Sequence, residues 1–222
     1  MQSLLKLTPG VGLHPRLKKS ETFIHLTNYD SPLNGHYLTE AKRFLDSYEK
    51  TDANADCTDG KLPATFPKTP CRFPVTQLGV CANPETAIPN GGPCVYIRLN
   101  KVYGWLPDID NTTGFTHAAI RCTGQNEIDG HLLGQPRYYP NITMPDGLTY
   151  GVIPNLYFPY INQPGYHTPI VGVQFPDIAE STLVMVDCKI YGLATDHSSV
   201  TFEIAVDGMP EGFTYNNATR KP

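Results

Sequence analysis

The sequence predicts a mainly β fold: an immunoglobulin-like antiparallel β-sandwich with one helix and disulfide-rich loops. Its 19 glycines and 21 prolines in 222 residues favour many turns and short strands over a mostly helical chain. Its 13 tyrosines and 9 phenylalanines belong to the residue types enriched in strands. Several segments also alternate apolar and polar residues, and the length suits a single sandwich domain.

Alternation with a period of two is clearest in the second half of the chain, for example at Val184, Val186 and Cys188. Such alternation buries one face of a strand and leaves the other in water. Strands are expected at residues 94–100, 117–122, 149–153, 171–175, 184–190 and 200–206, with a further short strand at 21–26.

One helix is expected at residues 36–50, because its apolar residues recur with the period of an α-helix. Their stripe predicts a face that docks against a sheet. The stripe consists of Tyr37, Leu38, Ala41, Phe44, Leu45 and Tyr48. The segment that follows, residues 51–93, is rich in proline and holds four cysteines, so we expect loops that depend on crosslinks.

The chain has six cysteines, and an even number in a loop-rich chain favours three disulfides over six reduced core thiols. No Cys-x-x-Cys spacing points to a metal or redox site, and no cofactor or metal is expected. Cys188 lies on the apolar side of its strand, and Cys122, at the end of another strand, is its natural partner. We expect this bridge to join the two sheets, as in immunoglobulin domains.

Three acceptor sequons for N-linked glycans stand at Asn111, Asn141 and Asn217. Together with the cysteines they indicate the secretory pathway. No apolar run in the chain is long enough for a signal peptide or a membrane helix, so we expect either a truncated chain or a membrane anchor upstream of Met1.

The composition disfavours several classes of function. With 17 Lys and Arg against 21 Asp and Glu, the net charge is −4, and no basic stripe suggests a nucleic-acid binder. Motifs of hydrolases, metalloproteases and nucleotide-binding enzymes are absent, and the histidines are scattered. We therefore expect no catalytic residues and no enzyme.

An aromatic run at Tyr157, Phe158, Pro159 and Tyr160 stands out in this turn-rich context. Such a run favours either a rigid interface surface or a local plug of the core, and the residues alone do not separate the two.

The order of these features resembles the ectodomain of the beta subunits of the Na+/K+- and H+/K+-ATPases over about residues 8–207. The most specific segments are Cys-Val-Tyr-Ile-Arg-Leu-Asn-Lys-Val-Tyr-Gly-Trp at 94–105 and Asp-Cys-Lys-Ile-Tyr-Gly at 187–192. The other matching segments are residues 9–13, 41–48, 71–73, 78–81, 92–93, 121–124, 157–160 and 173–175. The short linker at 193–199 and the tail at 208–222 depart from the family pattern and indicate a divergent member of invertebrate type.

The resemblance implies a noncatalytic glycoprotein at the plasma membrane, a type II protein with one membrane helix and an extracellular domain. Its partner would be the catalytic alpha subunit of a P-type Na+/K+-ATPase. The resemblance implies that the protein supports assembly of the alpha subunit and its delivery to the membrane, stabilises it, and modulates its ion affinity. The family pattern pairs the cysteines in chain order: Cys57–Cys71, Cys81–Cys94 and Cys122–Cys188. It also matches residues 157–160 to a motif for alpha-subunit assembly.

Three segments are expected on this basis: an irregular juxtamembrane segment at 1–35, a single immunoglobulin-like extracellular domain at 36–207, and a C-terminal tail at 208–222. The alternative function is a cell–cell adhesion ectodomain that acts without a pump and binds ectodomains on neighbouring cells.

Overall fold

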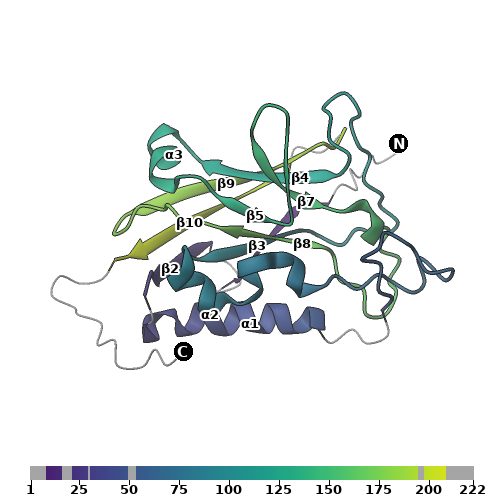
Figure 1. Ribbon diagram of the computed structural model, residues 1–222, viewed down its shortest axis with the longest axis horizontal. Coiled ribbons are helices and arrows are strands. Elements are labelled where there is room, and N and C mark those ends of the chain that lie inside the picture. The colour runs from purple at the N-terminus through teal and green to yellow at the C-terminus, as the bar shows by residue number, and fades with distance from the viewer. Residues whose placement is uncertain (1–8, 17–21, 30, 50–53, 195–197, 209–222) are drawn as a thin grey trace, which may run out of the picture.

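Two β-sheets packed face to face form the centre of the protein, and the long helix α1 lies outside them (Figure 1). The computed structural model describes residues 9–16, 22–29, 31–49, 54–194 and 198–208. The four-stranded sheet has the order β1 (Val11–His14), β3 (Cys94–Leu99), β8 (Ile170–Gln174), β5 (Arg137–Tyr139). The six-stranded sheet has the order β2 (Phe23–Thr27), β10 (Ser199–Asp207), β9 (Leu183–Tyr191), β4 (Ala118–Gly124), β7 (Thr149–Ile153), β6 (Asn141–Thr143). A mainly β sandwich is therefore confirmed.

The strands expected from alternation are all present, with ends shifted by one or two residues. Pairing is antiparallel throughout the described strands except between β2 and β10, which run parallel with Ile24 opposite Ile204. The sandwich is thus antiparallel except for this one edge pair, because a strand that arrives through a long connection can join a sheet in either direction.

The two sheets differ in how they are covered. Strand β9 alternates between buried and more exposed residues, as expected for a strand with one wet face. Every residue of β8 is buried, and so are all residues of β3 except Arg98. The four-stranded sheet is therefore the middle layer, with the six-stranded sheet on one face and other elements on the opposite face.

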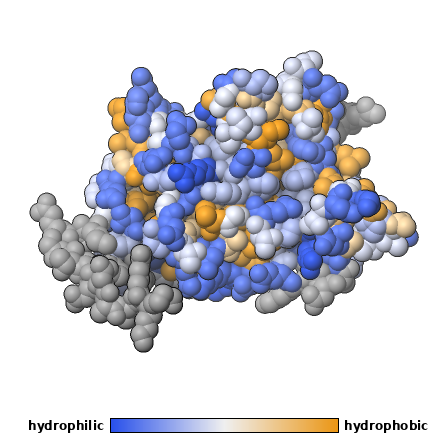
Figure 2. Space-filling model, in the orientation of Figure 1, coloured by the Kyte–Doolittle hydropathy of each residue, from blue (hydrophilic) through white to orange (hydrophobic). Residues whose placement is uncertain are grey.

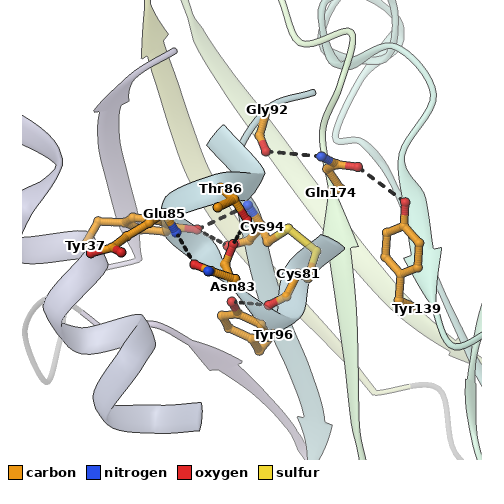
Figure 3. The surroundings of a disulfide bond; sticks show 10 residues. All are labelled: Tyr37, Cys81, Asn83, Glu85, Thr86, Gly92, Cys94, Tyr96, Tyr139 and Gln174. Atoms are coloured by element: carbon orange, nitrogen blue, oxygen red, sulfur yellow. Dashed lines mark hydrogen bonds between the residues drawn. A yellow bond between two sulfur atoms is a disulfide. The ribbon is translucent and has the colours of Figure 1, made fainter. Parts of the chain in front are cut away.

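Helix α1 (Gly35–Glu49) covers that opposite face, as the apolar stripe predicts. Tyr37, Ala41, Leu45 and Tyr48 are buried beneath it. The Tyr37 hydroxyl donates to the carbonyl oxygen of Cys94 at 2.5 Å and accepts from its backbone nitrogen at 3.1 Å. Because Cys94 begins β3, this pair of hydrogen bonds ties the helix to the sheet (Figure 3).

The segment after α1 is held against the same face by disulfides and short helical turns. The bridge Cys81–Cys94 joins it to β3, and Cys57–Cys71 closes a loop within it. Gly172 on β8 makes room for this bridge, because a Cβ there would lie 2.8 Å from the Cβ of Cys81. The helical turns are α2 (Pro84–Ala87) and the 3₁₀ segments Val75–Ala82 and Ile88–Asn90.

Several elements were not expected. Residues 1–35 were expected to be irregular apart from one strand, but Val11–His14 forms β1, paired with β3, and a 3₁₀ turn covers Pro32–Asn34. A further α-helix, α3 (Glu127–Leu133), follows its N-cap residue Asn126. The sequence predicted only the helix at residues 36–50. The alternation rule misses β1, β5 and β6 because strands of three or four residues contain too few repeats to show a period.

The disulfide Cys122–Cys188 forms, but it does not join the two sheets as expected. The two cysteines lie directly opposite each other on neighbouring strands β4 and β9 of the six-stranded sheet, with Cα atoms 3.9 Å apart. Alternation shows which face of a strand a cysteine occupies, but not which strand lies beside it.

Within the described parts of the chain, none of the helices has both the length and the apolar character needed to cross a membrane.

Candidate protein-binding surface

The aromatic run at residues 157–160 divides into a buried half and an accessible half. Tyr157 ends a 3₁₀ turn (Asn155–Tyr157) and is 3% exposed, and Phe158 is 5% exposed. Pro159 and Tyr160 are only partly buried. Both interpretations of the run therefore apply: Tyr157 and Phe158 fill the core, and Pro159 and Tyr160 reach the surface.

The buried half anchors the loop to both hydrophobic cores. The ring of Tyr157 lies 5.6 Å from that of Phe73, in the cluster between α1 and the four-stranded sheet. Phe158 belongs to the cluster between the sheets and meets Trp105 edge to face at 5.3 Å. Burial raises the pKa of Tyr157 to about 12, and the nearby Asp56 acts in the same direction. The side chains of Tyr157 and Phe158 are thus enclosed within the fold.

The accessible half lies beside a second segment that the sequence did not single out as a site. Tyr103 forms a parallel bridge with Tyr160, and the nitrogen of Gly104 donates to the carbonyl oxygen of Tyr160 at 2.8 Å. Tyr103 is 72% exposed, and Leu106, further along the same segment, is 58% exposed. We call Tyr103, Leu106, Pro159 and Tyr160 the aromatic patch.

A lysine supports the patch from beneath. The Nζ atom of Lys101 lies 5.3 Å from the ring centre of Tyr160 and 5.4 Å from that of Tyr166. It also donates to the carbonyl oxygen of Tyr166 at 2.8 Å. Partial desolvation and the charge of Arg98 lower the pKa of Lys101. Cation–π contacts of this kind are attractive and favour the observed position of the lysine between the two tyrosine rings.

The patch has the chemistry of a protein-binding surface. Tyrosines supply a large apolar area with a polar hydroxyl and few rotatable bonds, which is why they are enriched at interface hot spots. Here backbone hydrogen bonds and the buried pair Tyr157 and Phe158 hold the loop in place, so little ordering would accompany binding.

A pocket of about 460 Å³ lies elsewhere, between α3 and the turn that joins β6 to β7. Arg121, Arg137 and Thr149 are among its lining residues, and the surface between these elements is mostly hydrophilic (Figure 2). In the described residues, no three side chains of histidine, cysteine, aspartate or glutamate come together as a metal site would require.

Two of the three expected glycan acceptors lie in the described part of the chain, and both are exposed. Asn111 is exposed in a turn, and Asn141 is exposed at the start of β6. Asn217 lies outside the described residues. The disulfide pairs are those that the family resemblance implies.

The described residues thus define a class: a disulfide-linked β-sandwich domain with an exposed aromatic patch of the kind that binds proteins. The chain belongs to the sodium/potassium ATPase beta chain family, whose model matches residues 2–206.

Similar proteins in animals agree with this assignment. The chain is 27% identical, over 90% of its length, to a probable sodium/potassium-transporting ATPase subunit beta-3 of Caenorhabditis briggsae, and covers 64% of that protein. It is 29% identical, over 82% of its length, to the subunit beta-2 of Rhinella marina, and again covers 64% of the relative. A subunit beta-1 of Drosophila melanogaster is 23% identical over 92% of the chain. The chain therefore spans less than two thirds of the length of the first two relatives.

Proposed function

We propose that this chain is the extracellular part of a noncatalytic glycoprotein beta subunit of a sodium/potassium-transporting P-type ATPase. In this proposal it binds the catalytic alpha subunit, stabilises it, supports its assembly and delivery to the plasma membrane, and modulates its ion affinity. The names of the relatives and the family match support the subunit class. A membrane helix upstream of Met1 would anchor it as a type II protein, in line with the greater length of these relatives.

The aromatic patch is the observation that carries the binding proposal. It presents Tyr103 to solvent beside Tyr160, on a loop fixed by buried side chains, and Leu106 is exposed further along the segment that carries Tyr103. We assign contact with the alpha subunit to Pro159, Tyr160 and Tyr103, and we assign a supporting role to Tyr157 and Phe158. A partner that binds the folded domain shifts the equilibrium toward the assembled state by mass action.

An effect on ion affinity needs one further condition. The alpha subunit must change shape during transport, and the patch must bind one of its conformations more tightly than another. The free energy by which ion affinity changes can then be no larger than the difference in binding free energy between these conformations.

Co-expression of the full-length protein with an alpha subunit tests this assignment. We expect the double variant Tyr103→Ala and Tyr160→Ala to reduce the alpha subunit captured with it by about tenfold or more, because two hot-spot tyrosines each contribute about 1–2 kcal/mol. The matched control is Ile128→Ala on α3, since Ile128 is also 72% exposed. Capture should be unchanged in the control.

Resistance to proteolysis would show whether the variant domain remains folded. A folded double variant that captures the alpha subunit as well as the unaltered protein would contradict the assignment. Capture of another cell-surface protein, with no alpha subunit in any variant, would support adhesion without a pump.

A further inference from the structure

The six-stranded sheet ends at β6, and no other strand of the described chain pairs with the outer side of β6. An open edge presents unpaired backbone N–H and C=O groups, to which a strand of another molecule can add. Proteins commonly protect such edges with charges, bulges or a covering segment. β6 (Asn141–Thr143) is short, which itself limits strand addition, but it contains no charged residue.

The backbone register shows which residues face the open side. The nitrogen of Val152 donates to the carbonyl oxygen of Pro140 at 3.0 Å, and the nitrogen of Met144 donates to that of Leu148 at 2.9 Å. The backbone groups of residues 140 and 144 therefore hydrogen-bond toward β7. Residue 142, which is paired with Tyr150, also directs its backbone groups toward β7, because this direction alternates along an antiparallel strand. Asn141 and Thr143 consequently direct their backbone groups outward.

These two outward residues are the acceptor and the hydroxyl residue of one sequon, Asn141-Ile142-Thr143. Both side chains are exposed, whereas Ile142 between them is partly buried. The Nδ2 atom of Asn141 donates one hydrogen bond, to the carbonyl oxygen of Tyr138 at 2.8 Å. An amide that carries a sugar keeps one hydrogen, so a glycan at Asn141 is compatible with a retained bond of this kind.

We propose that Asn141 carries an N-linked glycan and that this glycan covers the open edge of β6, so that a second copy of the chain cannot add a strand there. A glycan is bulky and hydrated, and it begins at the outermost strand. The inference rests on the extracellular location in the proposed function, because only a chain in the secretory pathway meets the glycosylation machinery.

The sequon at Asn111 provides an internal control for access to the glycosylation machinery. Asn111 is exposed in a turn, outside any strand, so its glycosylation shows that the chain has met this machinery without involving an edge strand. The turn that holds Asn111 also lies close to the β6–β7 connection, since a Cβ on Gly114 would be 3.5 Å from the terminal methyl carbon of Met144. The loss of each acceptor is therefore tested separately.

The test compares Thr143→Ala with Thr143→Ser in the 222-residue chain, secreted from animal cells behind a cleavable signal. Both variants keep Asn141, but only serine preserves the sequon and a hydroxyl that can replace the contact of Thr143 Oγ1 with Thr149 Oγ1 at 3.1 Å. We expect mass spectrometry to find a glycan at Asn141 in the unaltered chain and in Thr143→Ser, but not in Thr143→Ala.

Light scattering after gel filtration measures the second half of the inference. We expect the associated fraction of Thr143→Ala to rise at least threefold over that of Thr143→Ser. Enzymatic removal of glycans from the unaltered chain, under native conditions, should raise association in the same way. A chain that lacks Asn111 as an acceptor (Asn111→Gln) should remain monomeric.

Two results would overturn the inference. If Asn111 is glycosylated and Asn141 is not, the edge glycan does not exist, while the extracellular location stands. If Asn141 is glycosylated but its loss leaves the chain monomeric, the glycan does not protect the edge. Absence of glycans at both sites would contradict the inference alone, because the added signal directs the chain into the secretory pathway; the proposed location is tested separately, by glycosylation of the full-length protein.

Discussion

At the scale of single residues, His14 shows how the fold sets the charge of a side chain. Its ring stacks on that of Phe44, with centres 4.0 Å apart and planes at 10°. Burial, followed by the positive charges of Arg98 and Arg16, lowers the pKa of His14 from 6.5 to about 4. The folded protein therefore holds this imidazole neutral at pH values where the unfolded chain would protonate it.

The sign of the pH dependence follows from this shift. Above pH 6.5 the neutral histidine contributes its full stabilisation, and between pH 6.5 and about 4 this contribution is lost because the unfolded chain binds the additional proton. We expect His14→Phe, which keeps a ring beside Phe44 and cannot be protonated, to lose less stability than the unaltered chain over this range.

Thermal unfolding of both chains between pH 7.5 and 4.5 measures the difference. Burial and the charges of Lys101 and Arg98 also lower the pKa of His167, so part of the pH dependence should remain in the variant. Identical pH slopes in the two proteins would exclude the role assigned to His14.

At the scale of elements, the loop closed by Cys57 and Cys71 depends on its crosslink. Its main backbone tie to neighbouring residues is at Ala55, which donates to the carbonyl of Pro70 at 3.0 Å and accepts from Arg72 at 2.8 Å. With so few backbone hydrogen bonds, local structure alone does not offset the conformational entropy that the segment loses when it becomes ordered.

Replacing both Cys57 and Cys71 by alanine tests this dependence. The bridge spans 14 residues, and closing a loop of that length stabilises the native state by about 3 kcal/mol in the chain-entropy account. We expect a loss of that order in urea unfolding and faster hydrogen exchange in residues 58–70.

The control is Lys61→Gln in the same loop, which removes an exposed ion pair with Asp59. Such pairs contribute little, so its stability should change by less than about 1 kcal/mol. Exchange that stays slow throughout the loop of the cysteine-free variant would show that other contacts hold it.

At the scale of the whole molecule, aromatic side chains link the two sheets. Phe175 follows β8 in the four-stranded sheet, and Phe202 lies on β10 in the six-stranded sheet. Their ring centres are 6.1 Å apart, and both side chains are almost completely buried. They belong to the larger hydrophobic cluster, which draws residues from both sheets.

Phe202→Ala should therefore destabilise the whole domain. Truncation of a buried phenylalanine costs about 3–5 kcal/mol, from lost apolar contact and the cavity left behind. Phe23→Ala on the edge strand β2 is the comparison, since Phe23 is 40% exposed and should cost much less. Chemical unfolding followed by both fluorescence and circular dichroism would measure the two changes; equal losses would contradict this account of the core.

The residues proposed for binding are only partly predictable from the sequence. The run at 157–160 was recognised as aromatic, but its division into buried Tyr157 and Phe158 and accessible Tyr160 was not. Tyr103 became part of the patch only because the fold places it beside Tyr160. The two tyrosines are far apart in the sequence, and no local pattern links them.

The sequence by itself determined the local features: the periods that form β9, β10 and α1, the turn-rich composition, the cysteines and the sequons. Only the tertiary structure decided which strands are neighbours, and hence that Cys122 and Cys188 bridge one sheet, that Val11–His14 extends another, and that β6 is an open edge. The physical reason is that a residue period depends on backbone geometry within one segment. Strand order depends on long-range packing, which is settled by contacts between segments distant in the chain.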